Sequence, residues 1–368
     1  MSSFLSKKRT KEGYLEKISS EPAATRRNRL SAIINFERFV SEKYGGRNAE
    51  QICDELSILQ GQEKENALYD MLQDWINWNQ QERKNTSTVR LMFASLRKFL
   101  YHKGIKTHPQ DVKENLKFGK ITNEERHPLS DDEYRAIVNA FSKSPRRQAL
   151  YLSLGSSGMR IGEATRLRKK DLNFSQERIE VNIPANITKT RKGRSTYISK
   201  EAASRLKPIL DKLNPEDLIF TKEHDDPLNA AIIEQKILTM ALDRLGLNDR
   251  YSSNNFRKIT SHSFRSYFFT KAARKHGENY AHKLVGHSGY LMQYDRMTGE
   301  EKLKMYLELE PDLMIFDQTK NEVEISKLRE ENQAIKELRE EVKKLRESQA
   351  KQDKKLLDDM REEGIIPK

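Results

Sequence analysis

The chain has 368 residues, enough for two domains and an appended segment, and 33% of them are charged against 36% hydrophobic. Its formal net charge is +13, while the part after Thr319 carries thirteen Lys and Arg against thirteen Asp and Glu, so the positive excess lies in residues 1–319. This excess favours an anionic partner, for which nucleic acid, a membrane surface and the ribosome stay open at this level. A single cysteine, Cys53, excludes an internal disulfide and a zinc site built from cysteines.

The sequence predicts neither export nor membrane insertion. No stretch approaches the roughly 20 apolar residues that cross a bilayer. The charges that begin by Lys7 are followed by no apolar run of the kind that a signal peptide needs. We therefore expect an intracellular, cytoplasmic protein without a membrane partner.

The first third of the chain predicts a helical domain preceded by a polar arm. Residues 1–21 are polar and irregular, and we expect a flexible arm there. Apolar residues then recur at helical spacing over residues 30–40, 68–76 and 89–100, which predicts a helical domain over residues 22–105.

The last of these predicted helices has a cationic face formed by Arg90, Arg97 and Lys98. Such a face is either solvated or in contact with the phosphates of a nucleic acid, and both interpretations stay open.

Residues 106–126 lose the helical periodicity and are rich in Lys, Asn, Pro and Gly, which predicts a linker. Ser130 and Glu133 then have the spacing of a capping box, which predicts the start of a new helix. A second domain is therefore expected over residues 127–317.

A small β element is predicted inside this second domain. Apolar residues alternate over 179–183, and Tyr197 and Ile198 follow after a polar stretch, which predicts two strands. The connection between them, residues 188–194, is strongly cationic. Helices are expected on either side, so the fold class is mainly α with a small β element.

The final segment, residues 318–368, has a heptad pattern. Its first series is Leu328, Ile335, Val342, Gln349 and Leu356, and its second is Leu338 and Leu345. Such a/d spacing predicts a C-terminal coiled-coil helix that joins copies of the chain. A single solvated helix is the alternative, because the clean stretch is short.

Several segments contain the residue types needed to break a phosphodiester bond without a metal. That reaction needs a nucleophile in line with the leaving oxygen, fixed cations for the developing charge, and an acid for the departing oxygen. Two arginines suit the second task, since a guanidinium can bind two phosphate oxygens at once. A tyrosine can be the nucleophile, because its phosphotyrosyl product stores the energy of the cleaved bond.

The candidate residues occur in a fixed order along the second domain. They are Arg160 in a Ser-Gly-Met-Arg segment, Lys189 on the cationic connection, His262 and Arg265 in one HxxR segment, His287 in Gly-His-Ser, and Tyr294 seven residues later. Gly158 is expected to permit a tight approach, and Arg160 is expected at a helix start, where the helix dipole also favours an anion. Each piece is common alone, so the order and the spacing carry the inference.

At these residues the chain resembles the tyrosine recombinase (phage integrase) family. The run SGMRIGEATRL is similar to the family's first motif, and SHSFRS with LVGHS to its second. The motif resemblance covers about residues 128–316, and the run YDR…YLELEPDL resembles integrases of archaea and their mobile elements.

The resemblance implies a two-domain clamp around double-stranded DNA and an active site made of Arg160, Lys189, His262, Arg265, His287 and Tyr294. It implies site-specific recombination through a 3′-phosphotyrosyl intermediate, a homo-oligomer on DNA such as a tetrameric synapse, and no cofactor, metal or small-molecule substrate. Arg160 and Arg265 would hold the phosphate and Lys189 would protonate the leaving oxygen. His262 would assist proton transfer, and His287 would hydrogen-bond the phosphate.

The sequence leaves alternatives open for two of the site residues, the nucleophile and the lysine. The interval from His287 to Tyr294 is shorter than is usual in the family, so Tyr290 and Tyr306 stay open as nucleophiles. Arg191 and Lys192 follow Lys189 and are alternatives to it. Two other functions also stay open: a type IB topoisomerase-like enzyme that nicks and reseals one duplex, and a non-catalytic DNA-binding coiled-coil protein.

Overall fold

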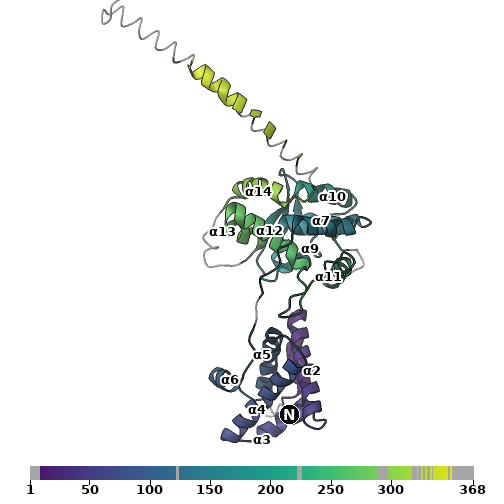
Figure 1. Cartoon of the computed structure of the whole chain (residues 1–368), viewed down its shortest axis with the longest axis vertical. Coiled ribbons are helices and arrows are strands. Elements are labelled where there is room, and N and C mark those ends of the chain that lie inside the picture. The colour runs from purple at the N-terminus through teal and green to yellow at the C-terminus, as the bar shows by residue number, and fades with distance from the viewer. Residues whose placement is uncertain are drawn as a thin grey trace, which may run out of the picture. The chain divides into compact units, whose positions relative to one another are not determined.

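The computed structural model describes residues 9–121, 124–221, 226–287 and 297–316, and scattered residues of 321–349, of which 335–346 are the longest run. The chain divides into two compact units (Figure 1). Unit 1 comprises residues 1–124 with 252–254, and unit 2 comprises residues 125–251 with 255–368.

Among the described residues of unit 1, all regular secondary structure is helical. Its helices are α1 (Lys11–Ser19), α2 (Ala23–Lys43), α3 (Ala49–Ile58), α4 (Gly61–Gln81), α5 (Thr86–His102) and α6 (Pro109–Asn115). The core is aromatic and contains Phe36, Trp75 and Phe99. Inside it the Trp75 indole donates to the Asn35 side-chain oxygen at 2.9 Å, and the Asn35 amide donates to Asn79 at 3.0 Å. This network satisfies the buried polar groups where α2 meets α4.

The expected flexible arm is wrong over residues 11–19. These residues form α1, in which Tyr14 and Ile18 are 2% and 1% exposed in the core of unit 1. The Tyr14 ring packs edge-on against Phe99, with 5.5 Å between ring centroids. Burial of these two side chains stabilises a helix that is too short to be stable by itself.

The expected linker over residues 106–126 is also partly wrong. Its first part contains α6, and Leu116 beyond it is only 5% exposed in the core of unit 1. The Tyr69 hydroxyl donates to the Asp111 carboxylate at 3.3 Å and so holds α6 on α4.

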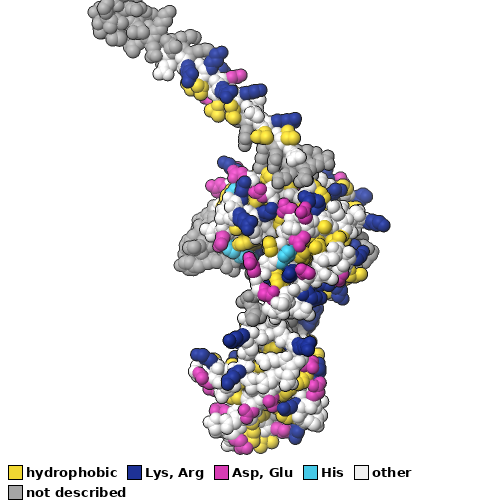
Figure 2. Space-filling view, viewed as in Figure 1, with side chains coloured by type: hydrophobic (Ala, Val, Ile, Leu, Met, Phe, Trp, Pro, Cys, Tyr) yellow, Lys and Arg dark blue, Asp and Glu magenta, His cyan; other side chains and the backbone are white. Residues whose placement is uncertain are grey.

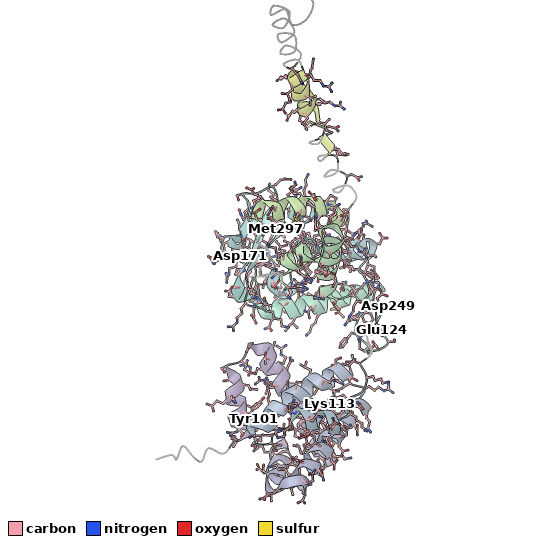
Figure 3. All side chains as sticks on the ribbon, turned by 90° about the vertical axis from the view of Figure 1, so that its left-hand side faces the viewer. Tyr101, Lys113, Glu124, Asp171, Asp249 and Met297 are labelled. Carbon is pink, nitrogen blue, oxygen red and sulfur yellow. The ribbon has the colours of Figure 1, made fainter. Side chains whose placement is uncertain are left out.

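The cations on α5 differ in their surroundings. The Arg90 guanidinium lies over the Phe118 ring, 5.0 Å from its centroid, and Arg97 donates to the Thr107 hydroxyl at 2.7 Å. Lys98 is exposed, as is Tyr101 near the end of the same helix (Figure 3). Contacts inside unit 1 thus hold two of the three cations, and phosphate binding by this face stays a prediction.

Unit 2 is mainly helical with one small sheet. Its helices are α7 (Asp131–Ala140), α8 (Pro145–Ser157), α9 (Ile161–Ala164), α10 (Lys200–Leu210), α11 (Pro227–Arg244), α12 (Ser261–His276), α13 (Glu278–Val285) and α14 (Gly299–Leu313). Helix α8 is the central element, since residues 148–157 are all buried and α7, α10, α12, α14 and β3 pack against it. The capping box predicted at the start of α7 is confirmed, because Ser130 and Glu133 each accept from the other's backbone N–H.

The predicted pair of strands is confirmed, and a third strand joins it. Strand β2 (Ile179–Ile183) pairs antiparallel with β3 (Arg194–Ile198), with Val181 opposite Thr196. The two-residue strand β1 (Leu172–Asn173) pairs with the other edge of β2. A strand of two residues has no periodicity from which a sequence could predict it.

The described part of the C-terminal segment is helical over residues 335–346. Its heptad residues Ile335, Leu338, Val342 and Leu345 are between 44% and 64% exposed and form an apolar stripe flanked by Lys and Arg (Figure 2). The helix is therefore present in this run, and its assembly into a coiled coil stays a prediction. Within the described residues, no helix combines the length and the apolar character that a bilayer crossing requires.

Candidate active site

Gly158 shapes the first part of the site. It ends α8 in the left-handed conformation, with φ of +66°, and its N–H donates to the Leu154 carbonyl at 3.0 Å. A Cβ atom there would lie 2.5 Å from the Phe268 ring and 2.9 Å from Val285. The predicted tight approach at Gly158 is confirmed, and any larger residue would push α12 or the end of α13 away.

Arg160 lies two residues later and caps the start of α9, as predicted. Because α9 is a single turn, its dipole adds little, and the guanidinium charge must supply the attraction for an anion. The Arg160 side chain is 28% exposed and donates to the Glu163 carboxylate at 2.9 Å. The guanidinium is thus held by Glu163 while part of the side chain faces solvent.

Glu163 is a residue that the sequence analysis missed. Its side chain is 2% exposed and accepts from Arg160 and, at 2.6 Å, from Arg194. Burial alone would raise the pKa of this carboxyl, but the hydrogen bonds and charges of Arg194 and Arg160 hold its pKa below the usual value. Its position three residues after Arg160, inside the first motif, was the available signal.

Arg265 is buried in unit 2, with 2% of the residue exposed. Its two terminal nitrogens donate to the carbonyls of Gly158 and Val285, each at 2.6 Å. Burial, together with the positive charges of Arg160 and Arg194, lowers the pKa of this guanidinium to about 9. Two nearby guanidiniums therefore repel that of Arg265, the Glu163 carboxylate offsets only part of this repulsion, and a bound anion would relieve more of it.

The two predicted histidines belong to the same electrostatic neighbourhood. His262 begins α12 one turn before Arg265; partial desolvation lowers the pKa of its imidazole, and the charges of Arg265 and Arg160 lower it further. His287 follows α13, and its Nδ1 lies 2.9 Å from Nδ1 of His282. Desolvation and the charge of Arg265 lower the pKa of His287 to about 4. Both rings are thus neutral near pH 7.

Lys189 lies in the connection between β2 and β3, as predicted, and its side chain is exposed. Arg191 and Lys192 are exposed beside it. Among the described contacts, none links the Lys189 amine to Arg160 or Arg265. The choice among these three cations therefore stays a prediction.

The tyrosines divide into two groups. Tyr290 and Tyr294 lie outside the described residues, which resume at Met297 before α14 (Figure 3). Tyr306 is 0% exposed, its hydroxyl donates to the Ser156 carbonyl at 2.8 Å, and burial raises its pKa well above the usual value. A phenol so enclosed packs in the core of unit 2, which argues against Tyr306 as a nucleophile.

Comparison with known proteins gives a consistent picture. Residues 127–294 match the model of the phage integrase family. A probable integrase/recombinase of Aquifex aeolicus (strain VF5) is 28% identical over an alignment of 179 residues, and the match covers 43% of this chain and 57% of that protein. The chain thus spans little more than half the length of this relative.

Two solved structures share the fold. A dimer of lambda integrase (residues 75–356) bound to a COC' core site superposes with a TM-score of 0.54 at 17% identity, covering 78% of this chain and 97% of that one. The Tn1549 transposon integrase (residues 82–397), in complex with transposon right end DNA, gives 0.53 at 12% identity, covering 81% and 96%.

Proposed function

We propose that the chain is a site-specific DNA recombinase of the phage integrase family, whose model its residues 127–294 match. It cleaves and rejoins double-stranded DNA through a 3′-phosphotyrosyl intermediate, with Tyr294 as the nucleophile. Because its substrate is DNA, the enzyme acts on DNA in the cytoplasm. Its active form is a homo-oligomer assembled on DNA.

The observation that carries this proposal is the convergence of guanidiniums around Arg265. Segments more than a hundred residues apart bring Arg160 and Arg265 close enough for the charge of one to lower the pKa of the other. Such crowding of positive charge is unfavourable in a buried site, and Glu163 offsets only part of it, so a bound anion would stabilise the cluster. A phosphodiester suits the site, because fixed guanidiniums hold its oxygens as charge develops on them.

The proposed chemistry follows from these positions. The Tyr294 oxygen attacks phosphorus and forms the phosphotyrosyl bond, while the bond from phosphorus to the 5′ oxygen breaks. Arg160 and Arg265 stabilise the charge on the other phosphate oxygens, and Lys189 gives a proton to the leaving 5′ oxygen. His262, neutral near pH 7, assists the transfer of the tyrosine proton, and neutral His287 donates to the phosphate. A 5′ hydroxyl from the partner duplex reverses the step and completes strand exchange.

A suicide substrate tests the proposal. A nick just beyond the scissile phosphate releases a short 5′-hydroxyl fragment, so that the covalent protein–DNA adduct accumulates and is visible on a denaturing gel. Adduct formation that requires Arg160 is the expected result, and a protein that binds DNA without adduct would be a non-catalytic DNA-binding protein. Joining of two differently labelled duplexes then distinguishes a recombinase from a topoisomerase-like enzyme, which reseals only one.

A further inference from the structure

The loop that carries Lys189 is attached to unit 2 on both sides. On its N-terminal side, the Arg166 guanidinium donates to the carbonyl of Ile187 at 2.5 Å and to the carbonyl of Gly162 at 2.7 Å. Ile187 is two residues before Lys189 and ends a short 3₁₀ helix (Ala185–Ile187). Arg166 thus ties the start of the loop to the segment that begins at Arg160.

On its C-terminal side the loop is held by Arg194, the first residue of β3. This side chain is only 8% exposed, and it donates to Glu163 at 2.6 Å and to the Leu284 carbonyl at 2.9 Å. Gly286 makes room for it, since a Cβ atom there would lie 2.6 Å from Cδ of Arg194. The second attachment thus also ends beside Arg160, because Glu163 accepts from both arginines.

These two attachments restrict where Lys189 can go. Between them lie residues 188–193, and both ends of that span are bonded to residues 162–166. Thr188 is itself buried, at 6% exposure, and its hydroxyl donates to the Ala185 carbonyl at 2.9 Å. The lysine therefore sits on a short, doubly anchored loop whose anchors share the segment that carries Arg160.

We propose that Arg166 and Arg194 are positioning residues for Lys189, which they hold where its ammonium can reach the 5′ oxygen of a phosphate bound at Arg160. The inference rests on the proposed function and deepens it. Neither arginine needs to touch DNA in this role. Two N–H donors of Arg166 bind backbone carbonyls, and Arg194 binds Glu163 and the end of α13. Their effect on the reaction passes through the proton that Lys189 supplies.

A substrate with sulfur in place of the bridging 5′ oxygen separates this role from a general loss of structure. On the ordinary substrate the bond from phosphorus to oxygen breaks, and the oxygen takes a proton from Lys189. On the sulfur substrate the bond from phosphorus to sulfur breaks, and the sulfur departs as a thiolate, which needs no proton because a thiol has a pKa of about 8.5. A defect confined to proton delivery should therefore disappear on sulfur.

The experiment measures single-turnover adduct formation by the full chain on both substrates. On oxygen, Arg166→Ala, Arg194→Ala and Lys189→Ala should each be slower than wild type by about 10²-fold, the usual contribution of a general acid. On the sulfur substrate, all three variants should form adduct at close to the wild-type rate. Arg168→Ala removes a neighbouring cation that instead bonds Glu216, and it should match wild type on both substrates. Arg160→Lys should stay slow on both, because the phosphate clamp acts on either leaving group.

The outcomes separate the inference from the proposed function. If wild type forms no adduct on either substrate, the proposed function fails and the inference fails with it. If wild type is active and the Arg166 and Arg194 variants are equally slow on both substrates, or unaffected on oxygen, the positioning role is wrong. Arg194→Ala leaves Glu163 with one partner fewer and could unfold unit 2. Arg166→Ala exposes only two backbone carbonyls, so it keeps the test decisive once circular dichroism shows a folded protein.

Discussion

The guanidinium of Arg265 donates to the carbonyl of Val285 at 2.6 Å, and so joins the first half of α12 to the last turn of α13. Carbonyls in the last turn of a helix have no donor within the helix. The same side chain satisfies the Gly158 carbonyl beyond α8. A residue predicted to hold the substrate phosphate therefore also holds three segments of the protein together.

Replacing either arginine of the clamp by lysine keeps the charge and removes the two-pronged geometry. We expect Arg160→Lys and Arg265→Lys each to lower the cleavage rate by about 10²–10³-fold, as when one fixed donor to developing charge is lost. Only Arg265→Lys should also lower thermal stability, because one ammonium cannot replace its donors to both carbonyls. Single-turnover cleavage and thermal denaturation of both variants measure this. If either variant cleaves DNA at the wild-type rate, the arginine replaced in it is not part of the active site.

The nucleophile is tested with a pair of phenylalanine variants. Tyr294→Phe should abolish the adduct and leave DNA affinity nearly intact, because the phenol oxygen makes the bond and adds little binding. Tyr306→Phe is the matched control: it should keep the adduct and lose about 1 kcal/mol of stability with the hydrogen bond to Ser156. Adduct formation by the Tyr294 variant, together with its loss in the Tyr306 variant, would reverse the assignment. Tyr290→Phe completes the set and is expected to keep the adduct.

Two glycines of one motif should respond differently to alanine. Gly158→Ala forces a side chain into a positive φ and against Phe268, which should cost about 2 kcal/mol or more. Cleavage should fall as well, since the displaced Gly158 carbonyl accepts from Arg265. At Gly162 an added Cβ meets nothing within 4 Å, so Gly162→Ala should be close to wild type in both measurements. Equal stability of the two variants would contradict this packing argument.

Glu201 should make the stability of unit 2 depend on pH. Its side chain, on α10, accepts from the backbone N–H of Phe316 at 2.8 Å and of Ile315 at 3.3 Å, and burial raises its pKa to about 7 from an ordinary 4.5. Between these two values the folded state binds the proton that the unfolded state has released. The free energy of unfolding should therefore fall as pH rises from 4.5 to 7.

The variant Glu201→Gln should remove this part of the pH dependence, because an amide does not titrate, while its single oxygen can still accept from the Phe316 N–H, the shorter of the two bonds. Thermal denaturation at several pH values measures the difference between variant and wild type. Glu216→Gln, at an exposed carboxylate, is the control and should retain the wild-type slope. An unchanged slope in the Glu201 variant would place the titration elsewhere.

The C-terminal heptads should act only when several copies are gathered. The segment after Thr319 has no net charge, so it should add nothing to the attraction between residues 1–319 and phosphates. A coiled coil of two or three heptads is marginal in water, but it gains from the high effective concentration on a recombination site. Truncation after Thr319 should therefore preserve the adduct on a suicide substrate and impair the joining of two duplexes.

Two results of that truncation would contradict the prediction. If the truncated protein joins two duplexes as well as the full chain, the helix is a solvated appendage. If it loses cleavage altogether, the segment packs on the catalytic unit, and the boundary near residue 317 is wrong.

The sequence alone was sufficient for features that depend on neighbouring residues. The capping box of Ser130 and Glu133, the alternation in β2 and the left-handed helix end at Gly158 are local, because hydrogen bonds and sterics within a few residues decide them. The residue types for phosphate chemistry were readable for a related reason: a clamp needs arginine and a nucleophile needs a hydroxyl, wherever the chain places them.

The tertiary structure decided everything that depends on distant partners. Nothing local distinguishes Arg194, whose carboxylate partner Glu163 is 31 residues away, from the exposed Arg191 three residues earlier. Helix α1 likewise owes its stability to the burial of Tyr14 against Phe99, far along the chain. A buried charge is tolerated only where the fold supplies its counter-charge, and a short helix persists only where the fold supplies its apolar contacts. Local sequence thus specified which groups could do chemistry, and long-range packing decided which of them are held together.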